Sequence, residues 1–158
     1  MNKKNRGFTL IELLMTLAIL GLLATITLPV SQLIQQRNKE RELRTALIEI
    51  RTAIDAYKHA SDDGRIAKSM GETGYPPNLE VLTSGVIDQR DPMRRKIFFL
   101  RRLPRNPLAL PQAQDEINSW GLRSYTSEAN DPKEGDDVYD VYVDSDQLGL
   151  NGIAYRYW

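Results

Sequence analysis

The side chains that could do chemistry leave few options for this chain of 158 residues. It has no cysteine, and His59 is its single histidine. Disulfide and thiolate chemistry are therefore excluded. A histidine-based metal site or a serine–histidine nucleophile would lack its usual components. The sequence also has no glycine-rich phosphate loop, so we do not expect an enzyme.

Oxygen donors gather in one loop near the end of the sequence. Asp144, Asp146 and Asn151 lie within residues 144–152, which end at Gly152. Carboxylate and amide oxygens on a flexible loop suit Ca²⁺. The spacing lacks the distal glutamate of an EF-hand, so the residues alone leave two interpretations open, a calcium loop and a polar β-turn.

A second chemically informative residue is Glu12, the only charged residue in the apolar run 8–30. Crossing a bilayer takes roughly 20 apolar residues, so this run predicts a membrane-spanning helix. A secretory signal peptide is disfavoured because its apolar region is typically about 7–15 residues long. A carboxylate at the centre of such a helix costs about 2.5–3.5 kcal/mol, and less near its end. Glu12 either reaches the headgroups or pairs with a cation. Pro29 favours a kink near the end of the run.

The residues around Glu12 carry a family resemblance. The sequence Arg6-Gly7-Phe8-Thr9-Leu10-Ile11-Glu12-Leu13, preceded by Lys3 and Lys4, resembles the signature of type IV pilin-like prepilins. The resemblance implies cleavage after Gly7 by a prepilin peptidase and N-methylation of Phe8. It also implies that Glu12 pairs with the new amine of a neighbouring subunit in a filament. The basic leader would stay in the cytoplasm, and the domain after residue 30 would be exported.

The elements that position these residues begin with a long helix. Apolar residues recur at helical spacing, which predicts an amphipathic helix over residues 31–62; they are Leu43, Leu47, Ile50, Ile54 and Tyr57. We interpret the charged run 37–44 as a solvated face. The segment 61–64, Ser-Asp-Asp-Gly, predicts the end of the helix.

The remainder, residues 63–158, predicts a small globular domain. The segment 75–79 is expected to open a short helix that continues through Leu82 and is ended by Gly85. The aromatic residues of segment 94–102 are expected to face the core. Strands are predicted at 120–126 and 137–143, and 153–158 is expected to be a third strand or a docked tail. The fold class is therefore α+β, with a long helix packed on a small antiparallel sheet.

Part of this domain resembles the G-type pseudopilins of type II secretion. The resemblance rests on the pattern Tyr75-Pro76-Pro77 with Leu79 and Leu82, and on the position and composition of the loop 144–152. It implies a calcium ion bound by Asp146 first, then by Asp144 and Asn151. It also implies a homopolymeric pseudopilus subunit that works with minor pseudopilins and an inner-membrane assembly platform, without nucleic acid.

The predicted organisation is a leader at 1–7, a membrane or filament-core helix at 8–30, an amphipathic stalk at 31–62 and a periplasmic domain at 63–158. The subunit would sit in the bacterial inner membrane before it enters a periplasmic filament. A pilin of a type IV pilus is the first alternative, although many such pilins have a C-terminal cysteine pair that is absent here. A single-pass, membrane-anchored periplasmic binding protein or enzyme is the alternative from another class.

Overall fold

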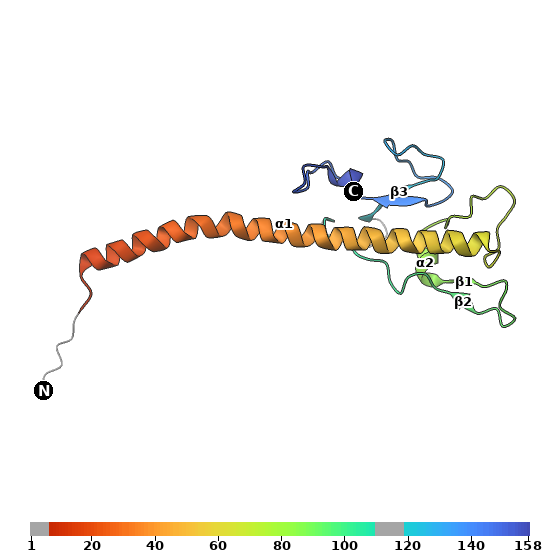
Figure 1. Ribbon diagram of the computed structural model, residues 1–158, viewed down its shortest axis with the longest axis horizontal. Helices are drawn as coiled ribbons and strands as arrows, with labels where there is room; N and C mark the ends of the chain where they lie inside the picture. The colour runs from red at the N-terminus through yellow and green to blue at the C-terminus, as the bar shows by residue number, and fades with distance from the viewer. Residues whose placement is uncertain (1–6, 110–118) are drawn as a thin grey trace, which may run out of the picture. The chain divides into compact units, whose positions relative to one another are not determined.

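The computed structural model describes residues 7–109 and 119–158, apart from the side chains of 25–29. Most of the expected leader and the side chain of Pro29 lie outside this description. The chain divides into two compact units, Met1–Asn38 and Lys39–Trp158. A single helix, α1 (Leu10–Asp62), belongs to both units and is continuous over 53 residues (Figure 1).

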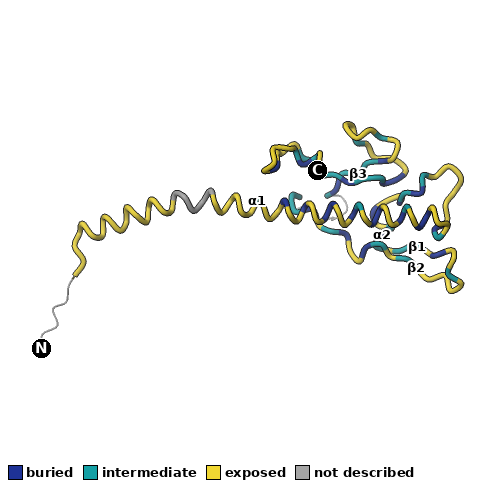
Figure 2. Tube along the Cα trace, in the orientation of Figure 1, coloured by how far each residue is buried: buried dark blue, intermediate teal, exposed yellow. Residues whose placement is uncertain are grey.

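The second half of α1 confirms the predicted amphipathic pattern. Buried positions recur along it, whereas the described residues of its first part are exposed (Figure 2). Leu43, Ile50 and Ile54 are fully buried, and each such side chain stabilises the fold by about 1.5–3 kcal/mol. The helix ends at Asp62 as predicted, and Gly64 follows with a φ of 69°, a conformation that glycine adopts without a steric penalty.

The unit Lys39–Trp158 adds short elements to the end of α1: α2 (Glu80–Ser84), β1 (Val86–Ile87), β2 (Lys96–Ile97), β3 (Gly121–Arg123), β4 (Asp140–Tyr142) and the 3₁₀-helix η2 (Tyr155–Tyr157). Strand β1 pairs antiparallel with β2, and β3 pairs antiparallel with β4. The predicted α+β class is therefore confirmed, with two small sheets.

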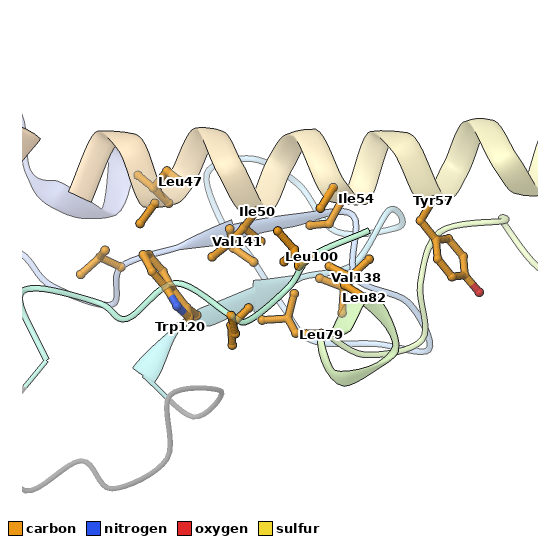
Figure 3. Close-up of a cluster of buried hydrophobic side chains, with 14 of the residues drawn as sticks. Leu47, Ile50, Ile54, Tyr57, Leu79, Leu82, Leu100, Trp120, Val138 and Val141 are labelled. Atoms are coloured by element: carbon orange, nitrogen blue, oxygen red, sulfur yellow. The ribbon is translucent and has the colours of Figure 1, made fainter. Parts of the chain in front are cut away.

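One hydrophobic core joins these elements to α1. Leu47, Ile50 and Ile54 project from α1 toward the side chains below it (Figure 3). The facing residues come from α2, the segment after β2, and β3–β4; they include Leu82, Leu100, Trp120, Val138 and Val141. The helix and the sheets therefore depend on each other for burial.

The segment after β2 corrects one prediction. Phe99 packs on the core, with its ring centroid 5.4 Å from that of Tyr57, but Phe98 is 62% exposed. Successive side chains of extended backbone point to opposite faces, so both aromatic rings could not face the core. Phe98 lies instead against Gly85, where an added Cβ would come within 2.8 Å of the ring.

Strands β3 and β4 are shorter than predicted because a buried carboxylate interrupts their pairing. Asp137 accepts hydrogen bonds from the hydroxyls of Thr73 and Ser124 and from the backbone N–H of Tyr125. Burial raises the pKa of Asp137, but these three hydrogen bonds outweigh it and hold the pKa below its ordinary value. Beyond Arg123, the backbone N–H of Ser124 donates to the Lys133 carbonyl and that of Tyr125 donates to the Asp137 side chain, so neither continues the β3–β4 ladder.

Candidate assembly site and C-terminal loop

The backbone around Gly7 and Phe8 is exposed and precedes the first helical residue, Leu10. Among the described residues, no heavy atom beyond the chain neighbours lies within 4 Å of a Cβ placed on Gly7, and Phe8 is 78% exposed. Proteases act on exposed, irregular backbone rather than on helices. The peptide bond between Gly7 and Phe8 is therefore accessible for cleavage.

Glu12 caps the start of α1 together with Thr9. The backbone N–H of Thr9 donates to the Glu12 carboxylate at 3.4 Å, and the N–H of Glu12 donates to the Thr9 hydroxyl at 3.3 Å. This reciprocal pair is a capping box. The positive end of the helix dipole also favours a carboxylate here. The prediction for Glu12 did not include Thr9, although the Thr-x-x-Glu spacing is the sequence signal for a capping box.

The capping box gives Glu12 a defined direction. Its carboxylate faces the backbone of Thr9, the residue that follows Phe8. Cleavage at Gly7 would leave the Thr9 amide intact, so the capping box can persist in the mature chain. Glu12 therefore stays at the same end of the helix as an amine formed on Phe8.

The first part of α1, on both sides of Glu12 in the sequence, presents exposed apolar side chains. Large apolar residues from Leu10 to Leu23 are at least 56% exposed; they are Leu10, Ile11, Leu13, Leu14, Met15, Leu17, Ile19, Leu20, Leu22 and Leu23. An apolar surface of this extent requires a lipid or protein environment.

None of the helices has a long enough apolar stretch for a bilayer crossing, counting only the side chains that the structure describes.

The loop 144–152 places a cation of the chain itself beside the two expected calcium ligands. The Arg156 guanidinium lies 3.3 Å from the Asp144 carboxylate and 2.9 Å from that of Asp146. The Asn151 side-chain oxygen accepts the backbone N–H of Ile153 at 3.0 Å. The three residues therefore share one loop, as predicted, but each has a protein partner.

In this arrangement both carboxylates of the loop are paired with Arg156. Ca²⁺ takes six to eight oxygen ligands, and among the described residues no three His, Cys, Asp or Glu side chains group around a common point. Both aspartates are also strongly exposed, at 77% and 81% of their side chains. Calcium binding by this loop stays a prediction, and Arg156 is the cation that the geometry supplies.

A buried carboxylate holds the same loop against α1. Glu40 is only 7% exposed and accepts the backbone N–H of Leu150 at 2.8 Å and the hydroxyl of Tyr155 at 3.0 Å. The solvated-face interpretation of 37–44 is therefore wrong for this residue. Its position three residues before Leu43, on the buried stripe, is the signal that could have identified it.

A second residue of α1, Arg51, is hydrogen-bonded both to β4 and to Trp158. Arg51 donates from Nε to the Asp140 carboxylate at 2.7 Å and from a terminal nitrogen to the main-chain oxygen of Trp158 at 2.8 Å. No sequence signal predicts this contact, because its partners lie 89 and 107 residues away.

Comparisons with known proteins agree with the start of the chain. Residues 2–28 match the family model described as the prokaryotic N-terminal methylation motif. The chain is 40% identical over 76 residues to the type IV major pilin protein PilA of Myxococcus xanthus, over 48% of this chain but only 34% of that pilin. The family resemblance of the start of the chain is thereby confirmed. The start of this chain is thus similar to the methylated N-terminal segment of type IV pilin-like proteins.

Over most of its length, this chain is similar to another group of proteins. It is 23% identical over 149 residues to the type II secretion system core protein G of Dickeya chrysanthemi, over 77% of this chain and 90% of that protein. It is also 25% identical over 108 residues to the core protein G of Vibrio cholerae, over 66% of each chain. No solved structure matches this chain.

Proposed function

We propose that this chain is a structural subunit of a periplasmic pseudopilus that drives protein export by type II secretion. The observation that carries the proposal is the start of α1. There, a single capped carboxylate, Glu12, precedes an exposed apolar surface and follows the accessible bond after Gly7. The similarity to core protein G over most of the chain supports the choice of filament.

In this proposal, cleavage between Gly7 and Phe8 creates the amine that Glu12 of a neighbouring subunit pairs with. A buried carboxylate without a counter-charge is costly, so the pair would fix the axial register of otherwise uniform apolar helices. Before assembly, the apolar run 8–30 would anchor the subunit in the inner membrane, with the basic leader in the cytoplasm. Minor pseudopilins, the prepilin peptidase and an assembly platform are the partners that the proposal requires.

The test combines processing with assembly. In cells that contain the peptidase, mass spectrometry of the purified subunit should find methylated Phe8 as the first residue. The Glu12→Leu variant should be inserted and cleaved but give no filaments. The control Thr16→Leu adds a leucine to the same segment without removing a charge, and it should assemble normally. An intact Met1, or normal filaments from Glu12→Leu, would contradict the proposal.

A type IV pilin is the second candidate, favoured by the 40% identity to PilA. Deleting the gene separates the two. Loss of an exported enzyme from the medium, with surface pili retained, supports the pseudopilus. Loss of surface pili with normal export supports the pilin.

A further inference from the structure

A polar cavity of about 510 Å³ lies between the β1–β2 hairpin and the chain that follows α1. Pockets that bind small ligands commonly have volumes of about 300–1,000 Å³. The charged side chains that line this cavity are Arg65, Asp88, Arg90, Asp91, Arg95 and Lys96. Four cations therefore accompany two carboxylates, and the wall of the cavity has a net charge of +2. A charge of this sign attracts an anion.

Backbone hydrogen bonds hold the walls of this cavity together. The N–H of Gln89 donates to the carbonyl of Arg65 at 2.7 Å, which fastens the hairpin to the chain that follows α1. The N–H of Asp88 donates to the carbonyl of Arg95 at 3.0 Å, which continues the pairing of β1 with β2. The backbone that carries the cations is therefore ordered by the chain's own contacts.

Both carboxylates of the cavity are engaged by neighbouring groups. Asp88 is buried, and one of its oxygens accepts two N–H groups of Arg65, at 2.7 Å and 3.0 Å. Its other oxygen accepts the backbone N–H of Arg90 at 3.0 Å. Asp91 accepts Nε of Arg95 at 2.6 Å and two backbone N–H groups of the turn. These hydrogen bonds, first those from the arginines, hold the pKa of both carboxyls below its ordinary value, so both stay ionised at neutral pH.

The other two cations of the cavity keep their charge for a ligand. Arg90 and Lys96 are exposed, and neither forms an ion pair with any residue that the structure describes. Lys96 donates one hydrogen bond to the carbonyl of Ser84 at 3.1 Å, and its ammonium has three donors in all. Arg65 and Arg95 also keep unused donors, because a guanidinium has five N–H groups. The cavity therefore combines unpaired positive charge with several donors.

We propose that this cavity binds a dianionic phosphate group. Such a group has a charge of about −1.5 to −2 at neutral pH and at least three acceptor oxygens, which matches the charge and the donors of the wall. A guanidinium binds phosphate oxygens in pairs, and a lysine adds a point charge. A carboxylate ligand has only one charge and two oxygens. The phosphate belongs either to a soluble compound or to a lipid headgroup, and the inference does not depend on the proposed filament function.

Titration with inorganic phosphate, followed by phosphorus NMR, tests the site in the full chain. The protein is held in a maltoside detergent at neutral pH and constant ionic strength, and a saturable change in the phosphate chemical shift is expected. Arg90→Gln and Lys96→Gln should each raise the Kd about tenfold, because each removes a charge-assisted hydrogen bond. The control Arg101→Gln removes an exposed cation that does not line the cavity. It should change the Kd by less than about twofold, because salt screens a distant exposed charge.

The outcomes decide both the site and the source of the phosphate. A shift that does not saturate overturns the proposal, and so does a Kd that Arg101→Gln raises as much as Arg90→Gln does. Displacement of phosphate by an equal concentration of acetate also overturns it, because the cations would then serve an acidic protein equally well. Phosphatidic acid added to the detergent separates the two sources. Displacement of bound inorganic phosphate assigns the site to a lipid headgroup, and unchanged binding assigns it to a soluble phosphate compound.

Discussion

Tyr155 holds the C-terminal segment against α1 through one hydroxyl. This hydroxyl donates to the Glu40 carboxylate at 3.0 Å, and the Tyr155 ring is 3% exposed. Substitution Tyr155→Phe removes the oxygen and leaves the ring, including its edge-to-face contact with Trp158. It therefore isolates the contribution of the hydrogen bond.

The magnitude follows from the acceptor. A hydrogen bond to a charged group contributes about 1.5–3 kcal/mol. The unit Lys39–Trp158 has about 120 residues, and an unfolding entropy near 2.1 cal/mol/K per residue converts this loss into a fall in Tm of roughly 6–12 °C. The control Tyr157→Phe removes a hydroxyl from a tyrosine that is 62% exposed, and its Tm should not change measurably.

The assay is thermal unfolding of the full chain in detergent, followed by tryptophan fluorescence. Both tryptophans, Trp120 and Trp158, belong to the unit that should melt. Glu40→Gln keeps an acceptor oxygen, and combining it with Tyr155→Phe should give a smaller loss than the two single losses added, because the two groups are in contact. A fall in Tm below about 2 °C for Tyr155→Phe, with additive effects in the double variant, would refute the reasoning.

Two further predictions concern acidic residues. Because the folded pKa of Asp137 is lowered, its contribution to stability is full above the ordinary pKa of about 4 and is lost as pH falls through the folded value. Asp137→Asn should therefore have a lower Tm than the wild type at pH 7, and this difference in Tm should be smaller at pH 3. A difference in Tm that is the same at both pH values would contradict this. For the loop 144–152, millimolar Ca²⁺ should leave the Tm of the wild type unchanged relative to EGTA. Arg156→Ala should lower the Tm, whereas Lys133→Ala, which breaks an exposed pair with Asp131, should not; a calcium-induced rise of several degrees in the wild type would support the calcium prediction instead.

Much of the fold follows from local patterns in the sequence. The buried stripe of α1 and its end near Asp62 could be predicted because helical periodicity and stop residues are local signals. Gly85 ends α2 as predicted. The sequence predicts a third strand or a docked tail at 153–158, and the 3₁₀-helix η2 at Tyr155–Tyr157 supports the second option. The β1–β2 hairpin was missed because each strand has only two residues, too few to show a period.

The sequence by itself was enough to predict the processing and assembly residues at the start of the chain. Gly7, Phe8 and Glu12 form a contiguous signature next to an apolar run, so their meaning depends on neighbours in sequence and not on folding. Only the tertiary structure decided the surroundings of Glu40, Arg51 and Arg156. Their partners lie 10 to 115 residues away in sequence, and they are brought together when the core of the second unit forms. The helical repeat of apolar residues is a property of one segment and can be recognised there. The partner of a polar side chain depends instead on which distant segment packs beside it in the folded chain.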